Sequence, residues 1–253
     1  MPPSPDDEAI LIELERLSRD PARGLLQFLS LAGARQYRAL YPRFRRYVPP
    51  GAAVLDWGPG NGHFSYFLTR AGFRATGFSF VPYSYQAWLG DPSYRFVIGT
   101  PSEPVALPFR DSEFDAVASI GVLEHVRETG GTEAASLAEI ARVLRPGGIF
   151  LAYHFPNRTS AIDFVASRTP GKHHHEWRYG RSDIEALTRG AGLDLIEARR
   201  YGILPRNSCH RLLGPLRHSR AAANVWDALD DALGAALSPL CQNWLFVARK
   251  PER

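Results

Sequence analysis

Short apolar segments alternate with segments of helical periodicity from residue 52 to the end of the chain. A short apolar run bounded by turn residues is typical of a buried strand. Strands that alternate with helices form a parallel sheet covered on both faces. We therefore predict an α/β fold built on a seven-stranded sheet. The expected strands are 52–56, 74–78, 95–98, 114–119, 149–154, 194–200 and 243–248.

Helical periodicity is clearest over 133–145, whose apolar residues share one face. A helix over 182–191 is predicted to begin with a capping box, in which the side chains of Ser182 and Glu185 satisfy each other's backbone N–H groups. The other expected helices of this region are 62–71, 82–89 and 222–237.

The N-terminal part of the chain has a different pattern. Residues 8–48 carry leucines and aromatic residues at helical spacing, and Pro49, Pro50 and Gly51 end that region. The predicted units are an N-terminal helical segment, 1–48, and one domain, 49–253, with an insert at about 201–221.

Composition excludes several classes of protein. The chain has 253 residues, a formal net charge of +4 and two cysteines. A charge this small does not by itself indicate nucleic-acid binding, and two cysteines cannot form a disulfide framework. The first residues lack the basic and apolar regions of a signal peptide, and no apolar run is long enough to span a membrane. We expect a cytoplasmic protein with no nucleic-acid partner and no integral membrane segment.

A glycine-rich turn joins an apolar strand to a helix in the segment 54–64, Val-Leu-Asp-Trp-Gly-Pro-Gly-Asn-Gly-His-Phe. Glycines permit positive φ angles and let a ligand approach the bare backbone. The first N–H groups of the following helix then face that ligand. The spacing is Gly-x-Gly-x-Gly after Asp56, whereas dinucleotide folds use Gly-x-Gly-x-x-Gly and an acidic residue much later. This difference disfavours a nicotinamide-dependent oxidoreductase.

The turn resembles the first motif of class I S-adenosylmethionine-dependent methyltransferases, of the small-molecule type. Three further segments resemble that family in the same order: 107–117 at the entry to its fourth strand, 121–126 after that strand, and 140–148 before its fifth strand. The resemblance covers about 52–200, and 243–250 is similar to the family's last, antiparallel strand. It implies a Rossmann-like, mostly parallel sheet with helices on both faces, an N-terminal helical lid and S-adenosyl-L-methionine as cofactor.

The resemblance also implies where the cofactor binds, at the carboxyl ends of the strands where the strand order switches. Asp56 would reach the cofactor's amino group directly or through water; alternatively, it only caps the turn. The other residues implied to line the cofactor are Gly58, Gly60 and Gly62 at the methionine portion, and Ser119, Ile120 and Gly121 at the sulfonium and adenosine.

Two positions depart from the family pattern. The family usually has an acidic residue that binds both ribose hydroxyls at the end of the second strand, where this chain has Ser79. A hydroxyl lacks the charge assistance of a carboxylate, so we expect weaker cofactor binding unless another group compensates. An acidic residue that accepts from the adenine amino group is expected before Leu107; Glu103 fits by one count and Thr100 by another. Glu103 is preferred, with an exposed loop charge as the alternative.

The acceptor side offers several histidines. His154 is expected at the carboxyl end of the fifth strand, and His174 and His175 lie in the connection that follows it; one of these three is the candidate general base. Adjacent histidines cannot all face one ion, and helical zinc sites use i,i+4 spacing, so no metal is predicted. The aromatic residues expected to contact the acceptor are Tyr37, Tyr41, Trp177 and Tyr179, with ordinary core packing as the alternative.

We interpret the chain as a methyltransferase whose acceptor is a small molecule: a natural product, a quinone-like ring, or a sugar or lipid precursor. The alternative is a catalytically inactive protein of the same fold that serves as a binding module or scaffold. Ser79 favours that alternative, and the intact glycine turn opposes it. A nucleic-acid methyltransferase is disfavoured, because no Asn/Asp-Pro-Pro-Tyr/Phe tetrad follows the fourth strand and no basic-aromatic stripe is present.

Overall fold

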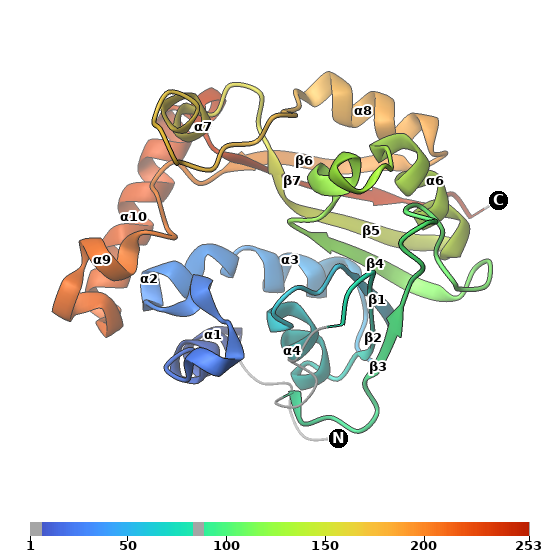
Figure 1. Cartoon of the computed structure of the whole chain (residues 1–253), viewed down its shortest axis with the longest axis horizontal. Helices are drawn as coiled ribbons and strands as arrows, with labels where there is room; N and C mark the ends of the chain where they lie inside the picture. The colour runs from blue at the N-terminus through green and yellow to red at the C-terminus, as the bar shows by residue number, and fades with distance from the viewer. Residues whose placement is uncertain (1–6, 83–88, 253) are drawn as a thin grey trace.

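The computed structural model describes residues 7–82 and 89–252. Its centre is a seven-stranded sheet in the order β3-β2-β1-β4-β5-β7-β6 (Figure 1). β7 runs antiparallel to β5 and β6, and the other pairs are parallel, which confirms the predicted fold class. The strands are β1 (Ala53–Trp57), β2 (Arg74–Ser79), β3 (Arg95–Ile98), β4 (Phe114–Ile120), β5 (Leu144–Pro156), β6 (Asp194–Tyr201) and β7 (Asn243–Arg249).

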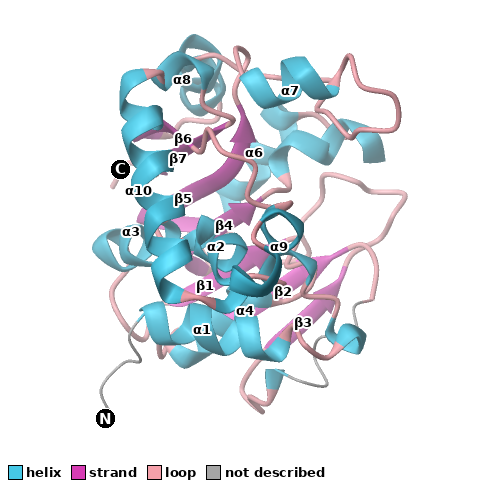
Figure 2. Cartoon of the chain, turned by 90° about the vertical axis from the view of Figure 1, so that its left-hand side faces the viewer, coloured by secondary structure: helices cyan, strands magenta, loops and turns pink. Residues whose placement is uncertain are grey.

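Helices cover both faces of this sheet (Figures 1 and 2). One face carries α1 (Asp7–Leu17), α3 (Leu40–Tyr47) and α4 (His63–Arg70), and the other carries α6 (Glu133–Val143) and α8 (Arg181–Gly190). The shorter or peripheral helices are α2 (Leu31–Ala34), α7 (Ala161–Ala166), α9 (Cys209–Leu212) and α10 (Arg220–Ala236). The 3-10 segments are η1 (Pro21–Arg23), η2 (Leu26–Phe28), η3 (Arg35–Tyr37), η4 (Leu123–Thr129), η5 (Gly214–His218) and η6 (Ser238–Leu240).

The two apolar layers follow from the alternation of side chains along each strand. In β1, Val54 packs in the cluster under α1, α3 and α4, whereas Leu55 packs in the cluster under α6 and α8. Leu151 and Ala152 of β5 divide in the same way. Successive side chains of a strand point to opposite faces, and both faces are covered, so a central strand reads as a continuous apolar run.

The strand order reverses at β1. This strand pairs with β2 on one side and with β4 on the other. Connections that leave two neighbouring strands in opposite directions open a crevice beyond their carboxyl ends. The glycine turn 58–62 follows β1 and Gly121 follows β4, so both segments lie at this crevice.

The start of α8 differs from the prediction. Its N-cap is Gly180, whose backbone N–H donates to Asp183 Oδ2 (2.6 Å). The predicted capping box of Ser182 and Glu185 is therefore wrong: the helix begins earlier, and Asp183 occupies the position from which a side chain reaches back to the cap. The predicted helix 82–89 falls almost entirely outside the described residues. Within the described ranges, no helix combines the length and the apolar character needed to cross a membrane.

The insert 201–221 packs on the N-terminal segment through one buried arginine. Arg206 Nη1 donates to Ala32 O (3.0 Å), and its guanidinium forms ion pairs with Asp227 (2.6 Å) and Asp230 (2.7 Å) of α10. The exposed fractions of these side chains are 7% for Arg206, 14% for Asp227 and 4% for Asp230. A cluster buried this deeply is sensitive to the loss of one partner, because the remaining charges have little access to water.

We expect Arg206→Met to lower the free energy of unfolding by about 3 kcal/mol, since it removes the arginine that pairs with the buried Asp230 carboxylate, whereas Asp227 keeps its ion pairs with Arg35 and Arg38. The matched control is Arg158→Met, which removes an ion pair with Asp183 whose side chains are 58% and 32% exposed. That change should lower the free energy of unfolding by less than about 1 kcal/mol. Urea denaturation of both variants measures the difference, and equal losses would contradict the assignment of the buried cluster.

Candidate functional site

A cavity of about 800 Å³ opens at the crevice beyond β1 and β4. Pockets of roughly 300–1,000 Å³ hold small molecules and cofactors in proteins. Its walls include the glycine turn, the ends of β2 and β4, the N-terminal segment at Tyr37, the loop before α8 at His175, and the insert at Arg206.

The glycine turn adopts backbone conformations that favour glycine. Gly58, Gly60 and Gly62 have φ angles of +74°, +54° and +80°. A Cβ at Gly58 would lie 2.5 Å from Val122 Cγ2, so glycine is needed there for the ends of β1 and β4 to approach. A Cβ at Gly60 would meet no atom within 4 Å, because this residue faces open space. Gly58 and Gly60 line the cavity, whereas Gly62 caps α4 outside its lining.

Asp56 lies beneath this turn and does not line the cavity. Its Oδ2 accepts a hydrogen bond from Ser65 Oγ (2.6 Å), and Ser65 Oγ lies 2.9 Å from Tyr94 OH. Its Oδ1 has no hydrogen-bond partner in the described part of the chain. Burial raises the pKa of the Asp56 carboxyl to about 7, although hydrogen bonds from Ser65 lower it. The carboxyl joins β1 to α4, and it would need a bridging water to reach a ligand in the cavity.

Three other predicted cofactor residues line the cavity: Ser79 at the end of β2, and Ile120 and Gly121 at the end of β4. Ser79 Oγ accepts a hydrogen bond from Val81 N (3.2 Å). The serine hydroxyl keeps its proton to donate elsewhere, so one hydrogen bond to a ligand remains available at this position.

Besides Asp56 and Gly62, two further predicted cofactor residues lie outside the cavity lining. Ser119 is buried, and its Oγ accepts from Leu123 N (3.1 Å), which fixes the start of η4. Glu103 is exposed on the connection between β3 and β4, although its neighbour Pro104 lines the cavity. The structure thus does not bring the Glu103 carboxylate to the site.

Two histidines and two tyrosines form one wall of the cavity. The ring centroid of Tyr37 lies 4.1 Å from that of His63 and 5.3 Å from that of His154. Tyr201 OH accepts from His154 N (2.9 Å) and lies 2.9 Å from His154 Nδ1. Burial lowers the pKa of both His63 and His154 to about 3. Both imidazoles are therefore neutral near pH 7.

The hydrogen bonds of His154 indicate which ring nitrogen carries its proton. The Asn243 side-chain amide nitrogen lies 3.3 Å from Nδ1 and can only donate, so Nδ1 accepts, and Tyr201 OH, 2.9 Å from the same atom, then donates to it as well. Two donors at Nδ1 place the imidazole proton on Nε2. His154 thus presents a donor, and its backbone has a φ angle of +65°, a conformation that costs a residue with a side chain about 1–2 kcal/mol.

A second group of titratable side chains lies near Gly121. Glu124 and His125 belong to η4, and His175 lies on the facing loop; all three line the cavity. Burial raises the pKa of the Glu124 carboxyl to about 8, against a hydrogen bond from its own backbone that lowers it. His175 Nδ1 lies 3.0 Å from Asp163 Oδ1, so the carboxylate accepts the Nδ1 proton and leaves Nε2 with a lone pair.

Of the other predicted catalytic and acceptor residues, some line the cavity and others lie outside its lining. Tyr37 lines the cavity. His174 is exposed and does not line it, since its side chain lies near Lys172 O (3.4 Å) instead. Tyr41 is fully buried and stacks on Phe67 with ring centroids 4.0 Å apart, so it is part of the core between α3 and α4.

Trp177 and Tyr179 also pack away from the cavity. The Arg127 guanidinium lies 5.5 Å from the Trp177 ring centroid. Tyr179 OH donates to Glu133, a residue that also pairs with Arg127 (2.7 Å). These contacts tie the segment before α8 to α6, which is a structural role.

Among the lining residues that sequence reasoning did not predict are His63, Glu124 and Tyr201. Two of them had a signal, since His63 follows the last glycine of the turn directly and Glu124 stands in the family-like segment 121–126. Tyr201 is the last residue of β6, and the pairing of β6 with β7 brings it to the site. No local sequence pattern shows this pairing.

The match to known proteins agrees with this geometry. A family model described as "Methyltransferase domain" matches residues 55–152. Demethylmenaquinone methyltransferase of Mycobacterium tuberculosis is 32% identical over 115 residues, which are 46% of this chain and 46% of that protein. Human probable tRNA methyltransferase 9B is 30% identical over 116 residues, 45% of this chain and 24% of that protein. The match thus spans less than half of the length of these relatives. Residues 55–152 of the chain are thus similar to a methyltransferase domain of class I.

Solved structures share the fold of this chain over most of its length. A Haloferax volcanii methyltransferase, solved with the Trm112 activator, has a TM-score of 0.60 at 20% identity and covers 94% of this chain and 98% of its own. Burkholderia thailandensis 1,6-didemethyltoxoflavin-N1-methyltransferase, solved with its substrate and S-adenosylhomocysteine, has a TM-score of 0.54 at 20% identity and covers 96% and 87%. At these identities the likeness establishes the fold.

Solved structures of this fold hold S-adenosylmethionine or S-adenosylhomocysteine, and the residues of the cavity fit this cofactor. Gly60 leaves open space where a backbone can approach a ligand. His63 Nδ1 is buried, without a hydrogen-bond partner among the described residues. The neutral imidazoles of His63 and His154 do not repel the positive sulfonium, as protonated ones would at close range.

We expect Gly60→Arg to weaken binding of S-adenosylhomocysteine at least ~100-fold, or about 2.7 kcal/mol, because the side chain enters the open space of the cavity. The matched control is Gly72→Arg: Gly72 has a φ angle of +79°, meets nothing within 4 Å and lies outside the cavity lining. Both variants carry the same backbone strain. Calorimetric titration measures both, and normal affinity in Gly60→Arg would contradict the assignment of the turn.

We expect Ser79→Asp to leave the affinity for S-adenosylhomocysteine equal or to tighten it by up to roughly tenfold, because a carboxylate makes stronger hydrogen bonds to hydroxyls than a serine does. Ser79→Ala is the comparison, since it removes the hydroxyl and adds no charge. The same titration measures both. A large loss of affinity in Ser79→Asp would show that the cofactor's ribose lies elsewhere.

Proposed function

We propose that this methyltransferase transfers the methyl group of S-adenosylmethionine to a small-molecule acceptor. The observation that carries the proposal is the shape of the cavity: the glycine turn and the ends of β2 and β4 form one end, and a group of histidines, tyrosines and Glu124 forms the other. A cofactor and an acceptor held in one cavity can react with little further catalysis, since the sulfonium is already reactive and positioning supplies most of the rate.

The cofactor would lie along the first of these ends. We assign the methionine portion to Gly58 and Gly60, the ribose to Ser79, and the adenosine to Ile120 and Gly121, all of which line the cavity. This placement puts the methyl group near Gly121. A Cβ at Gly121 would lie 3.7 Å from Glu124 Oε1 and 3.9 Å from His154 Cβ, so both side chains stand next to that position.

The acceptor would lie between the two histidine groups. His154 offers its Nε2–H, which suits an oxygen or nitrogen of the acceptor that keeps a free lone pair. His175 is the histidine whose unprotonated nitrogen remains free, because Asp163 holds its other nitrogen. We therefore place the withdrawal of charge or of a proton from the acceptor at His175, and the orientation of the acceptor at His154.

The positions of the N-terminal segment and the insert favour an acceptor that is a small molecule. Tyr37 and Arg206 lie in the cavity wall, and Tyr153 OH donates to Gln36 O (2.6 Å), which holds the N-terminal segment against β5. We propose that residues 1–48 act as a lid over the site, joined by the insert 201–221. A cavity walled on these sides suits a compact acceptor better than a folded nucleic acid.

A binding protein without catalysis remains the alternative, and Ser79 is the observation that favours it. Calorimetry with S-adenosylhomocysteine is the first measurement. Micromolar binding supports a working cofactor site, and no binding at millimolar ligand overturns the proposed function.

Transfer is then measured with methyl-tritiated S-adenosylmethionine and two acceptors offered in parallel. One is a demethylated naphthoquinol, the acceptor class in the name of the mycobacterial relatives, and the other is a tRNA transcript, the class in the name of the mammalian relatives. We expect label in the small molecule and none in the tRNA. Label in tRNA alone would overturn the small-molecule proposal, and Gly60→Arg serves as the blank for non-enzymatic labelling.

We expect His175→Gln to lower the rate of transfer by about a hundredfold or more, within the range for a positioned proton-transfer group, while the affinity for S-adenosylhomocysteine changes little. His174→Gln is the matched control, because the neighbouring imidazole is exposed and outside the cavity lining. Equal rates in the two variants would contradict the role assigned to His175.

A further inference from the structure

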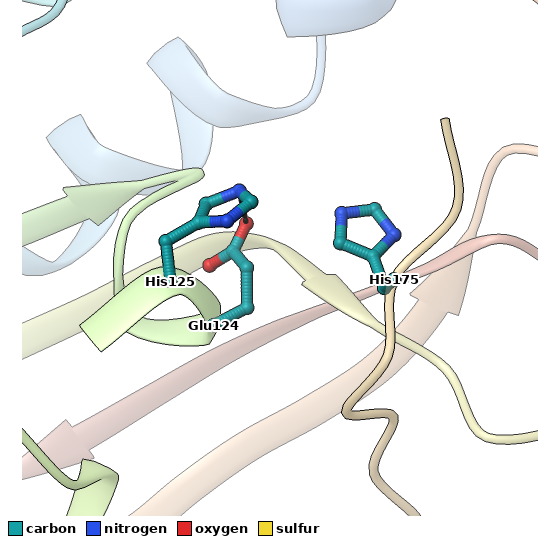
Figure 3. A group of neighbouring side chains, drawn as sticks. All are labelled: Glu124, His125 and His175. Carbon is teal, nitrogen blue, oxygen red and sulfur yellow. Dashed lines mark ion pairs between the residues drawn. The ribbon is translucent and has the colours of Figure 1, made fainter. Parts of the chain in front are cut away.

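Three side chains from two separate segments converge at the acceptor end of the cavity. Glu124 and His125 lie on η4, and His175 lies on the loop between α7 and α8 with its ring turned toward them (Figure 3). One ligand atom of each residue lies within 4.8 Å of the others. This arrangement differs from the run of adjacent histidines in the sequence, since only one member of that run takes part.

The Nδ1 atom of each histidine lies within hydrogen-bond distance of a carboxylate oxygen. His125 Nδ1 lies 2.7 Å from Glu128 Oε1, and His175 Nδ1 lies 3.0 Å from Asp163 Oδ1. A histidine held in this way has its proton on Nδ1 and its lone pair on Nε2, which is the arrangement that metal-binding histidines show. Asp163 is itself fixed, because its Oδ1 also accepts from His175 N (3.1 Å).

Glu124 supplies a carboxylate that the protein leaves without a cationic partner. Its side chain is 3% exposed, and His125 Nε2 lies 4.0 Å from Glu124 Oε1. In the described part of the chain, no other side chain hydrogen-bonds to it. A carboxylate buried in this way is expensive unless a positive charge accompanies it. One ring nitrogen of each histidine lies within 4.8 Å of a Glu124 carboxylate oxygen.

We propose that Glu124, His125 and His175 bind a divalent transition-metal ion of the Zn²⁺ type at the acceptor end of the cavity. Two imidazole nitrogens and one carboxylate oxygen form the ligand set of catalytic zinc sites, which keep a position open for water or substrate. The nitrogen ligands favour this class over Mg²⁺ and Ca²⁺, which prefer oxygen alone.

The side chains must move slightly to close on an ion. Bonds of about 2.0–2.2 Å in a tetrahedral site place ligand atoms roughly 3.3–3.6 Å apart, whereas these atoms lie within 4.8 Å. The side chain of His125 is 36% exposed and that of His175 is 17% exposed, so both rings have room to turn. The backbone of η4 and of the loop can stay where it is.

The position of the site gives the ion a role toward the acceptor, and this role rests on the proposed methyl transfer. When the ion is bound it takes the lone pair of His175 Nε2, so the ion, and not the free imidazole, then draws charge from the acceptor. Glu124 Oε1 would lie 3.7 Å from a Cβ at Gly121, the residue that we place beside the methyl group. An ion held by three residues on the cavity wall has its open positions toward the cavity. It would hold an oxygen of the acceptor there, so an acceptor with a phenol, enol or vicinal hydroxyl group is expected.

The test is titration of the metal-free full chain, purified without a histidine tag, with Co²⁺ and then with Zn²⁺. Visible ligand-field absorption reports Co²⁺ bound to nitrogen ligands. We expect one equivalent of Co²⁺ to bind and one equivalent of Zn²⁺ to displace it. Glu124→Gln and His175→Gln should abolish this binding, and Asp163→Asn, which keeps all three ligands, should weaken it about tenfold to a hundredfold.

His174→Gln separates this site from adventitious binding to the histidine run. It should bind Co²⁺ like the unaltered chain, because His174 is exposed and outside the cluster. Binding that survives Glu124→Gln and is lost in His174→Gln would overturn the proposal, as would no binding by the unaltered chain. Circular dichroism of each variant confirms that it is folded.

Calorimetry with S-adenosylhomocysteine on the same metal-free chain distinguishes failure of the metal site from failure of the proposed function. Normal cofactor binding without any bound Co²⁺ overturns the metal site alone. Bound Co²⁺ without cofactor binding supports the metal site and overturns the methyltransferase assignment.

Discussion

The cavity depends on one close approach between two strand ends. Gly58 follows β1 and Val122 follows β4, and a Cβ at Gly58 would lie 2.5 Å from the valine side chain. Because the strand order reverses between these two strands, their loops leave in opposite directions from this contact. The segments that follow the two strands line opposite sides of the cavity. Gly60 lies on one side, and Gly121 and Glu124 lie on the other. A larger residue at Gly58 would push the two halves of the site apart.

The strands could be predicted from sequence because burial on both faces makes each of them a short apolar run between turn residues. The glycine turn could be assigned because positive φ angles and open space restrict a position to glycine in any context. Side-chain roles depend on packing and were less predictable. Tyr41 and His174 have the same chemistry as Tyr37 and His175, yet only the latter pair lines the cavity. Residue type alone does not show which way a side chain faces.

Burial sets the electrostatics of the site. The imidazoles of His63 and His154 are neutral because desolvation disfavours their charged forms. The same effect raises the pKa of the Glu124 carboxyl. These two imidazoles therefore carry little charge near pH 7, and hydrogen-bonding groups of the cavity wall are held in place by neighbours such as Tyr201 and Asp163. A cation that enters, whether a sulfonium or a metal ion, meets no positive charge on these imidazoles.

The histidine run shows why spatial convergence and sequence adjacency must be judged separately. Neighbouring residues in an extended loop alternate in direction, so His174 and His175 point apart: one lies near a loop carbonyl and the other bonds to Asp163. What brings His175 to Glu124 is the anchoring of its loop on α7 through that aspartate, and the anchoring of η4 on the end of β4 through Ser119. These two anchors are local hydrogen bonds, but the site they create joins segments that are some fifty residues apart. Its chemistry therefore follows from how the loops are held, and a residue that never touches a ligand can decide it.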